Sequence, residues 1–409
     1  MHPIERSTAY KRDRDTPMTD SLDRVRSRIL ADPGLQHRLT AIEDRSTFVA
    51  ALLDVAQASG ITLDAATVGD AIAPDPLGLR RFDTVAAIMD DWPCDGWLPT
   101  AIVPASGGAV IEWLHFGGAP LDAPFFEDSI RAARRRPFNR LVQWRTPLAE
   151  LATAAPALTA PDGFVFHMSR CGSTLVAQMI GAVAGTRVVS EAAPIDAVVQ
   201  VARSHPDPVG PACVALLRAM VGALGRGGGP GGAYVVKLDS WHTLALPLFR
   251  AAFPDVPWIF LYREPVEVMV SQMRMRGLQT VPGAIGDPYD IPPGLSVESH
   301  VGRVLAQIAE AVLDHDRSNR LLVPYADLPD AVAARILPHF KMVATAEDRA
   351  EMAAVATRDA KRPGTPFSAD GAHKRAEASP AVAAAAITHL ASSHRRLAAA
   401  VRAQSGEQP

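Results

Sequence analysis

The residue types around position 170 are suited to holding a negatively charged group. The stretch FHMSRCGSTL (residues 166–175) ends an apolar run in a short polar turn, and a helical pattern follows at once. The first N–H groups of a helix are unpaired and partly positive, so a glycine-containing turn before a helix can wrap a phosphate or a sulfate. Arg170 would add a cationic fork, Gly172 a close backbone approach, and Ser173 and Thr174 two hydroxyls.

A second pair of residues suits the same kind of ligand. Arg263 ends the apolar run PWIFLYR, and Ser271 follows eight positions later on a predicted helix. A guanidinium and a hydroxyl in this arrangement can converge on a terminal phosphate. The alternative for Arg263 is a surface ion pair with Glu264 or Glu267.

The order of residues in the first turn differs from the GxxxxGK[ST] loop of nucleotide triphosphatases, because its basic residue precedes the glycine. RCGST resembles the 5′-phosphosulfate loop of sulfotransferases, (K/R)-S-G-[ST]-T, with Cys171 in place of serine. Arg263 and Ser271 resemble the 3′-phosphate site of that family, and LLVPYADL resembles its late strand and YxDL turn. The resemblance covers residues 162–345.

This resemblance implies 3′-phosphoadenosine 5′-phosphosulfate as the sulfuryl donor. The donor-binding residues that it implies are Arg170, Cys171, Gly172, Ser173, Thr174, Arg263 and Ser271, with Lys361 and Arg362 beside Gly364 as a late basic segment. A solvated loop is the alternative for that late segment.

The implied reaction also needs charge stabilisation and a base. Arg170 and Lys237, which ends the run AYVVKL, would stabilise charge on the leaving group; a structural lysine is the alternative for Lys237. Glu191 follows TRVVS and resembles the base glutamate of tyrosylprotein sulfotransferases. Asp239 stands where small-molecule sulfotransferases have the histidine of their KTH motif, and His242 lies three positions further. We expect the base to be Glu191, then His242, then Asp239.

The elements that must position these residues alternate from residue 163 onward. The runs GFVFHMS, TRVVS, AYVVKL, PWIFLYR and LLVPYADL are strand-like, and helical patterns separate most of them. Near-continuous apolar strands alternating with helices predict an α/β fold with a parallel sheet flanked by helices. The resemblance implies the P-loop-like sulfotransferase type. Ligands bind such sheets at the carboxyl ends of the strands, and we expect loops 192–212 and 279–295 to form the acceptor pocket.

Four segments organise the whole chain. We expect a disordered tail (1–21), a small helical module (22–75), a linker with a small α+β segment (76–160) and the α/β domain (161–409). The helical module should hold three amphipathic helices, with Asp44 or Ser46 and Asp64 as caps. Within 101–150 we expect one or two strands and a helix from about Phe125 to Arg136.

The helical module has a resemblance of its own. Its segments DPGLQHRL and FVAALLDVAQASGITL resemble the leader domain of nitrogen-fixation and nitrile-hydratase-like ribosomal peptide precursors. This resemblance implies a peptide-maturation partner, and a plain helical packing module is the alternative.

Composition excludes several classes of protein. A net charge of −3 over 409 residues gives no basic field for nucleic acid. Three widely spaced cysteines fit neither a disulfide framework nor a zinc site, so we expect no metal. The sequence has neither a secretory signal nor a run of about 18 apolar residues, so we expect a cytoplasmic protein without a membrane span.

Together these patterns predict a sulfotransferase acting on a hydroxyl, phenol or amine of a small molecule or peptide, such as a peptide natural product. An ATP-dependent kinase is one alternative, which the missing GK[ST] disfavours. A non-catalytic peptide-binding scaffold is the other.

Overall fold

The computed structural model describes residues 21–77, 89, 92–105, 107–119, 121–152, 158–227, 232–286, 288–315, 317–359, 362–366 and 371–404. The predicted tail lies outside these residues, apart from Ser21. The chain forms two compact units, Met1–Ala119 with Ile130–Ala154, and Pro120–Ser129 with Ala155–Pro409. Within the described ranges, none of the helices is both long enough and apolar enough to cross a membrane.

The first unit begins with α1 (Ser21–Leu30), α2 (Pro33–Thr40), α3 (Arg45–Ala58) and α4 (Ala65–Ala71). Asp32, Asp44 and Asp64 cap α2, α3 and α4, each accepting an N–H three residues ahead at 2.8–3.0 Å. Asp44, and not Ser46, is thus the cap of α3. The prediction of three helices was wrong because the break between α2 and α3 contains neither glycine nor proline.

Three strands form an antiparallel sheet in this unit: β1 (Trp97–Ala105), β2 (Gly108–His115) and β3 (Trp144–Pro147), in the order β1-β2-β3. The helices α6 (Phe126–Arg135) and α7 (Pro137–Leu141) lie between β2 and β3 in the chain. The predicted strands and helix of this region are confirmed, and β3 was missed because it has only four residues.

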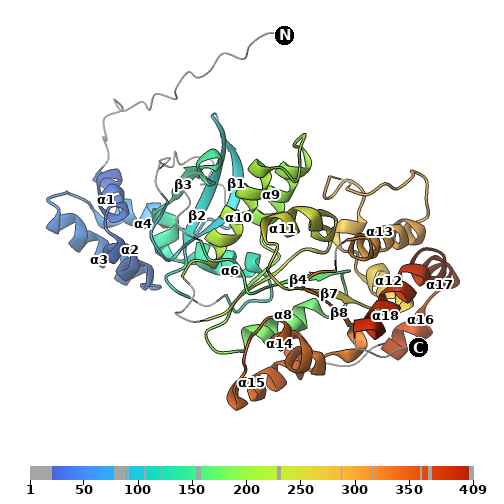
Figure 1. Ribbon diagram of the computed structural model, residues 1–409. Coiled ribbons are helices and arrows are strands. Elements are labelled where there is room, and N and C mark those ends of the chain that lie inside the picture. Colours follow the sequence, from blue (N-terminus) through green and yellow to red (C-terminus); the bar gives the residue numbers. More distant parts are fainter. Residues whose placement is uncertain are drawn as a thin grey trace, which may run out of the picture. The chain divides into compact units, whose positions relative to one another are not determined.

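The second unit contains the parallel sheet (Figure 1), which confirms the predicted fold class. Its strands are β4 (Gly163–His167), β5 (Arg187–Ser190), β6 (Tyr234–Lys237), β7 (Trp258–Tyr262) and β8 (Arg320–Pro324), in the order β5-β6-β4-β7-β8. All neighbours are parallel, so every strand ends at the same edge. The turn after β4 therefore lies in the middle of that edge.

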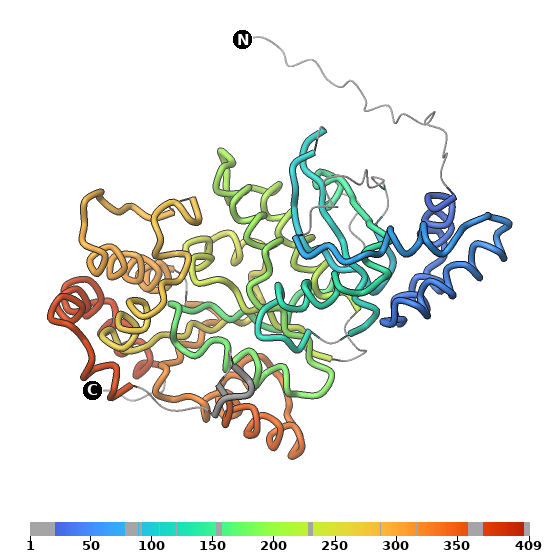
Figure 2. Tube along the Cα trace, turned by 180° about the vertical axis from the view of Figure 1, so that it is seen from behind, coloured from blue at the N-terminus to red at the C-terminus, as the bar shows by residue number. Residues whose placement is uncertain are grey.

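Helices cover the sheet. They are α8 (Ser173–Gly181), α9 (Ala193–Arg203), α10 (Pro211–Gly225), α11 (Leu246–Ala252), α12 (Pro265–Arg274), α13 (Val297–Leu313), α14 (Leu337–His339), α15 (Ala346–Ala356), α16 (Gly371–Glu377), α17 (Pro380–Ala385) and α18 (Ala391–Gln404). Helices α8, α14 and α15 lie on one face, with α9, α10 and α11 on the other (Figure 1). Figure 2 shows the C-terminal helices beside α12 and α13.

One expectation about the loops was wrong. Residues 192–212 are not a loop, because α9 occupies Ala193–Arg203 with a buried face that includes Ile195 and Val198. The proline at 194 suggested a loop, but it lies in the first turn of the helix, where proline is favoured.

Candidate active site

The turn after β4 has the backbone shape of an anion cradle. Ser169, Arg170 and Gly172 all have positive φ, at 76°, 53° and 83°, and Gly172 caps the N-terminus of α8. Successive N–H groups in such conformations point into a concavity that suits phosphate or sulfate. A Cβ on Gly172 would lie 2.8 Å from Leu328 Cδ1, so only glycine fits at this position.

Buried contacts hold the cradle in place. The Ser169 N–H donates to His167 Nδ1 at 3.0 Å, and Gln272 Nε2 donates to the Ser169 hydroxyl at 3.0 Å. The Cys171 thiol donates to Leu261 O at 3.2 Å, and burial raises its pKa to about 12. Cys171 is therefore a packed, protonated thiol.

Arg170 lies at the rim of the cradle. Its Nη2 donates to Met275 O at 2.6 Å, just beyond the end of α12. A guanidinium has five N–H donors, and this contact uses one of them. Partial burial lowers the pKa of Arg170, while the Glu191 carboxylate opposes that shift.

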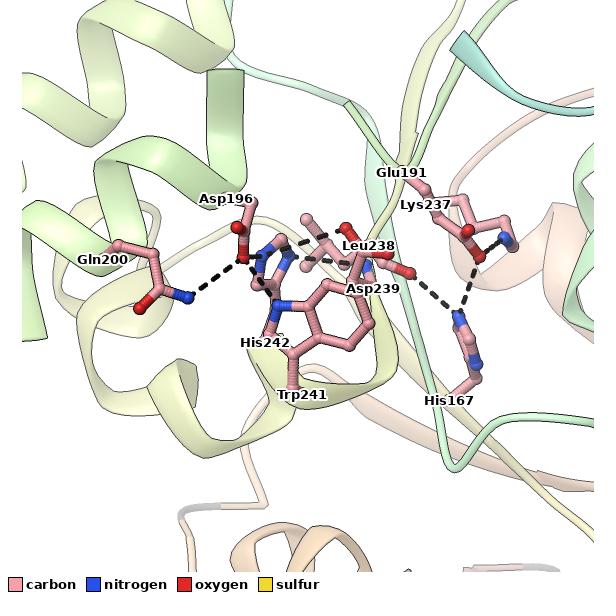
Figure 3. A network of polar contacts seen from close by, with 9 residues as sticks. All are labelled: His167, Glu191, Asp196, Gln200, Lys237, Leu238, Asp239, Trp241 and His242. Carbon is pink, nitrogen blue, oxygen red and sulfur yellow. Dashed lines mark hydrogen bonds and ion pairs between the residues drawn. The ribbon is translucent and has the colours of Figure 1, made fainter. Parts of the chain in front are cut away.

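Lys237 and Glu191 meet beside His167 (Figure 3). The Lys237 side chain is fully buried at the end of β6, and its ammonium is ion-paired with the Glu191 carboxylate. His167 Nε2 lies 2.8 Å from Leu238 O and 3.6 Å from Glu191 Oε1. Burial raises the pKa of Glu191, but Lys237 and His167 outweigh it and hold that pKa below its usual value.

A second polar network begins two residues after Lys237 (Figure 3). The Asp239 N–H donates to His242 Nδ1 at 3.3 Å, and His242 Nε2 lies 3.0 Å from Asp196 Oδ1. Trp241 Nε1 also donates to Asp196 Oδ1, at 2.6 Å. Burial raises the pKa of Asp239 to about 7, aided by the charge of Glu191. Asp239 thus titrates near neutral pH.

The second motif lies against the first. Arg263 Nη1 lies 3.5 Å from Arg170 O, and the Arg263 guanidinium stacks 3.9 Å from the centre of the Tyr325 ring. Arg263 Nε also donates to Glu267 Oε2 at 2.8 Å. The alternative for Arg263 was a surface ion pair with Glu264 or Glu267. The pair with Glu267 exists, but both side chains are at most 7% exposed, so it is buried and not at the surface.

Glu267 has a further partner that the sequence did not indicate. Arg375, from α16, is also ion-paired with Glu267, which therefore lies between two guanidinium groups. Ser271 follows Glu267 by one turn on the same side of α12. Arg375 was missed because more than a hundred residues separate it from Arg263.

The remaining predicted donor-binding residues have different outcomes. Ser173 and Thr174 occupy the first turn of α8 and are buried. Lys361 lies outside the described residues. Arg362 lies in β10 (Arg362–Pro366), which pairs with β9 (Arg358–Asp359), and its side chain is outside the description.

The structure thus brings the backbone cradle together with cationic side chains and the carboxylates paired with them. Arg263 contacts the loop that holds Arg170 and is paired with Glu267. Lys237 is paired with Glu191, and Glu191 and Asp239 follow the ends of β5 and β6. Asp196 was missed because it belongs to the segment expected to be a loop. Trp241 was missed with it, because its indole bonds Asp196. This arrangement can bind a doubly anionic phosphate ester and accept a proton beside it.

No family model matches the chain, and no curated protein matches it. Among solved structures, the sulfotransferase domain from the curacin biosynthetic pathway is 16% identical, with a TM-score of 0.36, over 50% of this chain and 80% of that chain. The sulfotransferase domain from the Synechococcus PCC 7002 olefin synthase is 14% identical, with a TM-score of 0.36, over 57% and 96%.

Sulfotransferase STF1 from Mycobacterium tuberculosis H37Rv is 16% identical, with a TM-score of 0.31, over 59% of this chain and 81% of that chain. These structural neighbours are all sulfotransferases.

Proposed function

We propose that this chain is a sulfotransferase that uses 3′-phosphoadenosine 5′-phosphosulfate as donor. The observation that carries the proposal is the contact of Arg263 with the loop that holds Arg170, at 3.5 Å from Arg170 O. A donor with phosphate groups at both its 5′ and 3′ positions needs two cationic sites within one molecule's reach. The two motifs supply them side by side.

The residues have separate roles in this proposal. The loop N–H groups and Arg170 bind the 5′-phosphosulfate, and Lys237 stabilises charge that develops on the leaving phosphate oxygen. Arg263, Arg375 and Ser271 bind the 3′-phosphate. Glu267 holds the two arginines in position before donor binding, because its carboxylate already pairs with both.

Three residues are candidates for the base, and their surroundings differ. The pKa of Glu191 is lowered, so its carboxylate is a weak base at neutral pH. Both ring nitrogens of His242 have partners, and the side chain is fully buried. A base is most effective when its pKa lies near the working pH, and the pKa of Asp239 is about 7. We therefore assign the base role to Asp239, with Glu191 positioning Lys237.

Transfer proceeds as one displacement at sulfur. The acceptor oxygen forms the new S–O bond while the bond from sulfur to the phosphate oxygen breaks. Asp239 takes the hydroxyl proton, and 3′-phosphoadenosine 5′-phosphate leaves with the electron pair of the broken bond. In-line positioning between the cradle and Asp239 supplies the orientation.

Calorimetric binding of 3′-phosphoadenosine 5′-phosphate, with and without Mg²⁺, tests the proposal. We expect binding independent of Mg²⁺ and lost in Arg263→Ala. Arg250→Ala is a matched control, because Arg250 bonds carbonyl groups at the opposite end of the sheet. Absence of binding, or a preference for ATP with Mg²⁺, would overturn the proposal and favour a kinase.

A further inference from the structure

A cavity of about 300 Å³ lies beside the proposed reaction centre, between α8 and the edge strand β5. Residues 121–124 line one of its walls, and Val355 of α15 lines another. Asp348, near the start of α15, accepts the Ala184 N–H at 2.9 Å and so ties α15 to the turn between α8 and β5. The cavity is therefore bounded by elements that are already fixed to one another.

The lining of the cavity follows β5 over most of its length. It runs along β5 from Ser190, at the carboxyl end, to Thr186, just before the amino end. Four residues of extended chain span about 13 Å. Small residues of α8 and its C-cap, Ala177, Gly181 and Ala182, form the facing wall. A volume of about 300 Å³ along that length suits an unbranched chain better than a fused ring system.

One end of the cavity lies at the charged pair. Ser190 is the register partner of Lys237 and immediately precedes Glu191. Pro124, in the wall formed by residues 121–124, is followed by Phe125, whose ring centre lies 5.4 Å from Lys237 Nζ. A hydroxyl at this end of the cavity would therefore lie beside the Lys237–Glu191 pair.

The other end offers polar groups. The Thr186 hydroxyl oxygen is buried and has no hydrogen-bond partner among the described residues. A buried hydroxyl without a partner carries a desolvation cost that a ligand can relieve. Arg358, an exposed residue, is also in the lining.

From this geometry we propose that the cavity is the acceptor site, and that the acceptor is an unbranched aliphatic alcohol with a second hydrogen-bonding group at its far end. The reacting hydroxyl lies beside Lys237, the chain lies along α8 and β5, and the far group bonds Thr186. The reaction of the alcohol in this cavity rests on the proposed function, but its binding there does not.

Calorimetric binding of 1,8-octanediol and 1-octanol tests the cavity directly. We expect 1,8-octanediol to bind the wild type more tightly than 1-octanol, and Thr186→Val to remove that difference. Val355→Phe fills the cavity and should weaken both ligands at least tenfold. Ala353→Phe is the matched control, because Ala353 is an exposed residue of the same helix outside the lining. Among shorter diols, affinity should fall by about fourfold per methylene removed.

Unchanged diol binding in Val355→Phe would overturn the acceptor site. Equal binding of diol and alcohol by the wild type would overturn the role of Thr186. If Val355→Phe unfolds, Ala182→Leu serves as a second filling variant on the opposite wall.

The same proteins separate this proposal from the proposed function. If Val355→Phe loses diol binding and the wild type does not bind 3′-phosphoadenosine 5′-phosphate, the ligand site in the cavity stands and the sulfotransferase function is refuted. If the nucleotide binds but Val355→Phe leaves diol binding unchanged, the proposed sulfotransferase function stands and the acceptor site is refuted.

Discussion

The Lys237 ammonium, which is 0% exposed, is ion-paired with the Glu191 carboxylate, which is 25% exposed. A buried cation of this kind depends on its partner, because removing one member of a buried pair leaves the other charge uncompensated. A substitution of either residue should therefore change both the stability of this sheet edge and the positive charge that Lys237 is proposed to supply.

Glu191→Gln should lower the free energy of unfolding by about 2 kcal/mol, less than for a fully buried pair because Glu191 is partly exposed. Glu191→Gln with Lys237→Met should recover most of that loss, because no buried charge remains. Since the pKa of Glu191 is lowered in the folded state, the wild-type advantage should be full at pH 7 and shrink as the pH falls below about 4.3. Urea unfolding at several pH values measures this, and strictly additive single mutants would contradict it.

The pH dependence of turnover should report Asp239. With a pKa of about 7, kcat/KM should rise as the pH increases through neutrality, because the base must be deprotonated. Asp239→Asn should lose about 10²–10⁴-fold in rate and flatten the profile. Asp255→Asn, at an exposed loop position, is the control. A profile unchanged in Asp239→Asn would return Glu191 to first place.

Asp239 should also affect stability in a predictable direction. A folded pKa raised from about 3.9 to about 7 means that the folded state keeps a proton that the unfolded state releases. The free energy of unfolding of the wild type should therefore decrease as the pH rises from about 3.9 to about 7. Asp239→Asn should not show this decrease. Thermal unfolding at pH 4 and pH 8 compares the two proteins.

The affinity for a 3′-phosphate should depend on Arg375. Arg375→Ala should weaken 3′-phosphoadenosine 5′-phosphate binding about tenfold, the equivalent of about 1.4 kcal/mol for one charged contact. Adenosine 5′-monophosphate, which lacks the 3′-phosphate, should bind equally to both proteins. Arg274→Ala is the matched control, since Arg274 also joins α12 to α16, through Glu377. Equal losses in the two variants would mean that the helix contact, and not the charge, matters.

Cys171 should resist alkylation in the folded protein. Its side chain is 0% exposed and its pKa is about 12, so thiolate is scarce at pH 8. Mass spectrometry after iodoacetamide treatment should find Cys171 modified only when denaturant is present. Cys171→Ser should keep nucleotide binding, because the loop binds through its backbone.

The sequence was sufficient to predict the sheet of the second unit because its strands are short, apolar and separated by helices. The position of the RCGST turn, between a strand and a helix, was also predictable, because the residues that indicate it are adjacent in the chain. The left-handed backbone at Ser169 and Arg170 was not, because neither residue type favours it.

Most of the site contacts that the sequence did not predict join residues far apart in the chain. Arg375 lies opposite Glu267 because α16 packs on α12, and Tyr325 stacks on Arg263 because β8 lies next to β7. Neither pair has a local signal. The ion pair of Lys237 with Glu191 also lacks a local signal, because only the strand register places the two residues together.

The central position of β4 has a consequence for the order in which the protein is made. Its neighbours β6 and β7 come later in the chain, and Leu261 in β7 accepts both the Met168 N–H and the Cys171 thiol. A nascent chain that ends before residue 258 has the whole cradle sequence but lacks the strand that shapes it. Nucleotide binding should therefore appear during synthesis only after β7 has left the ribosome, long after the loop itself has emerged.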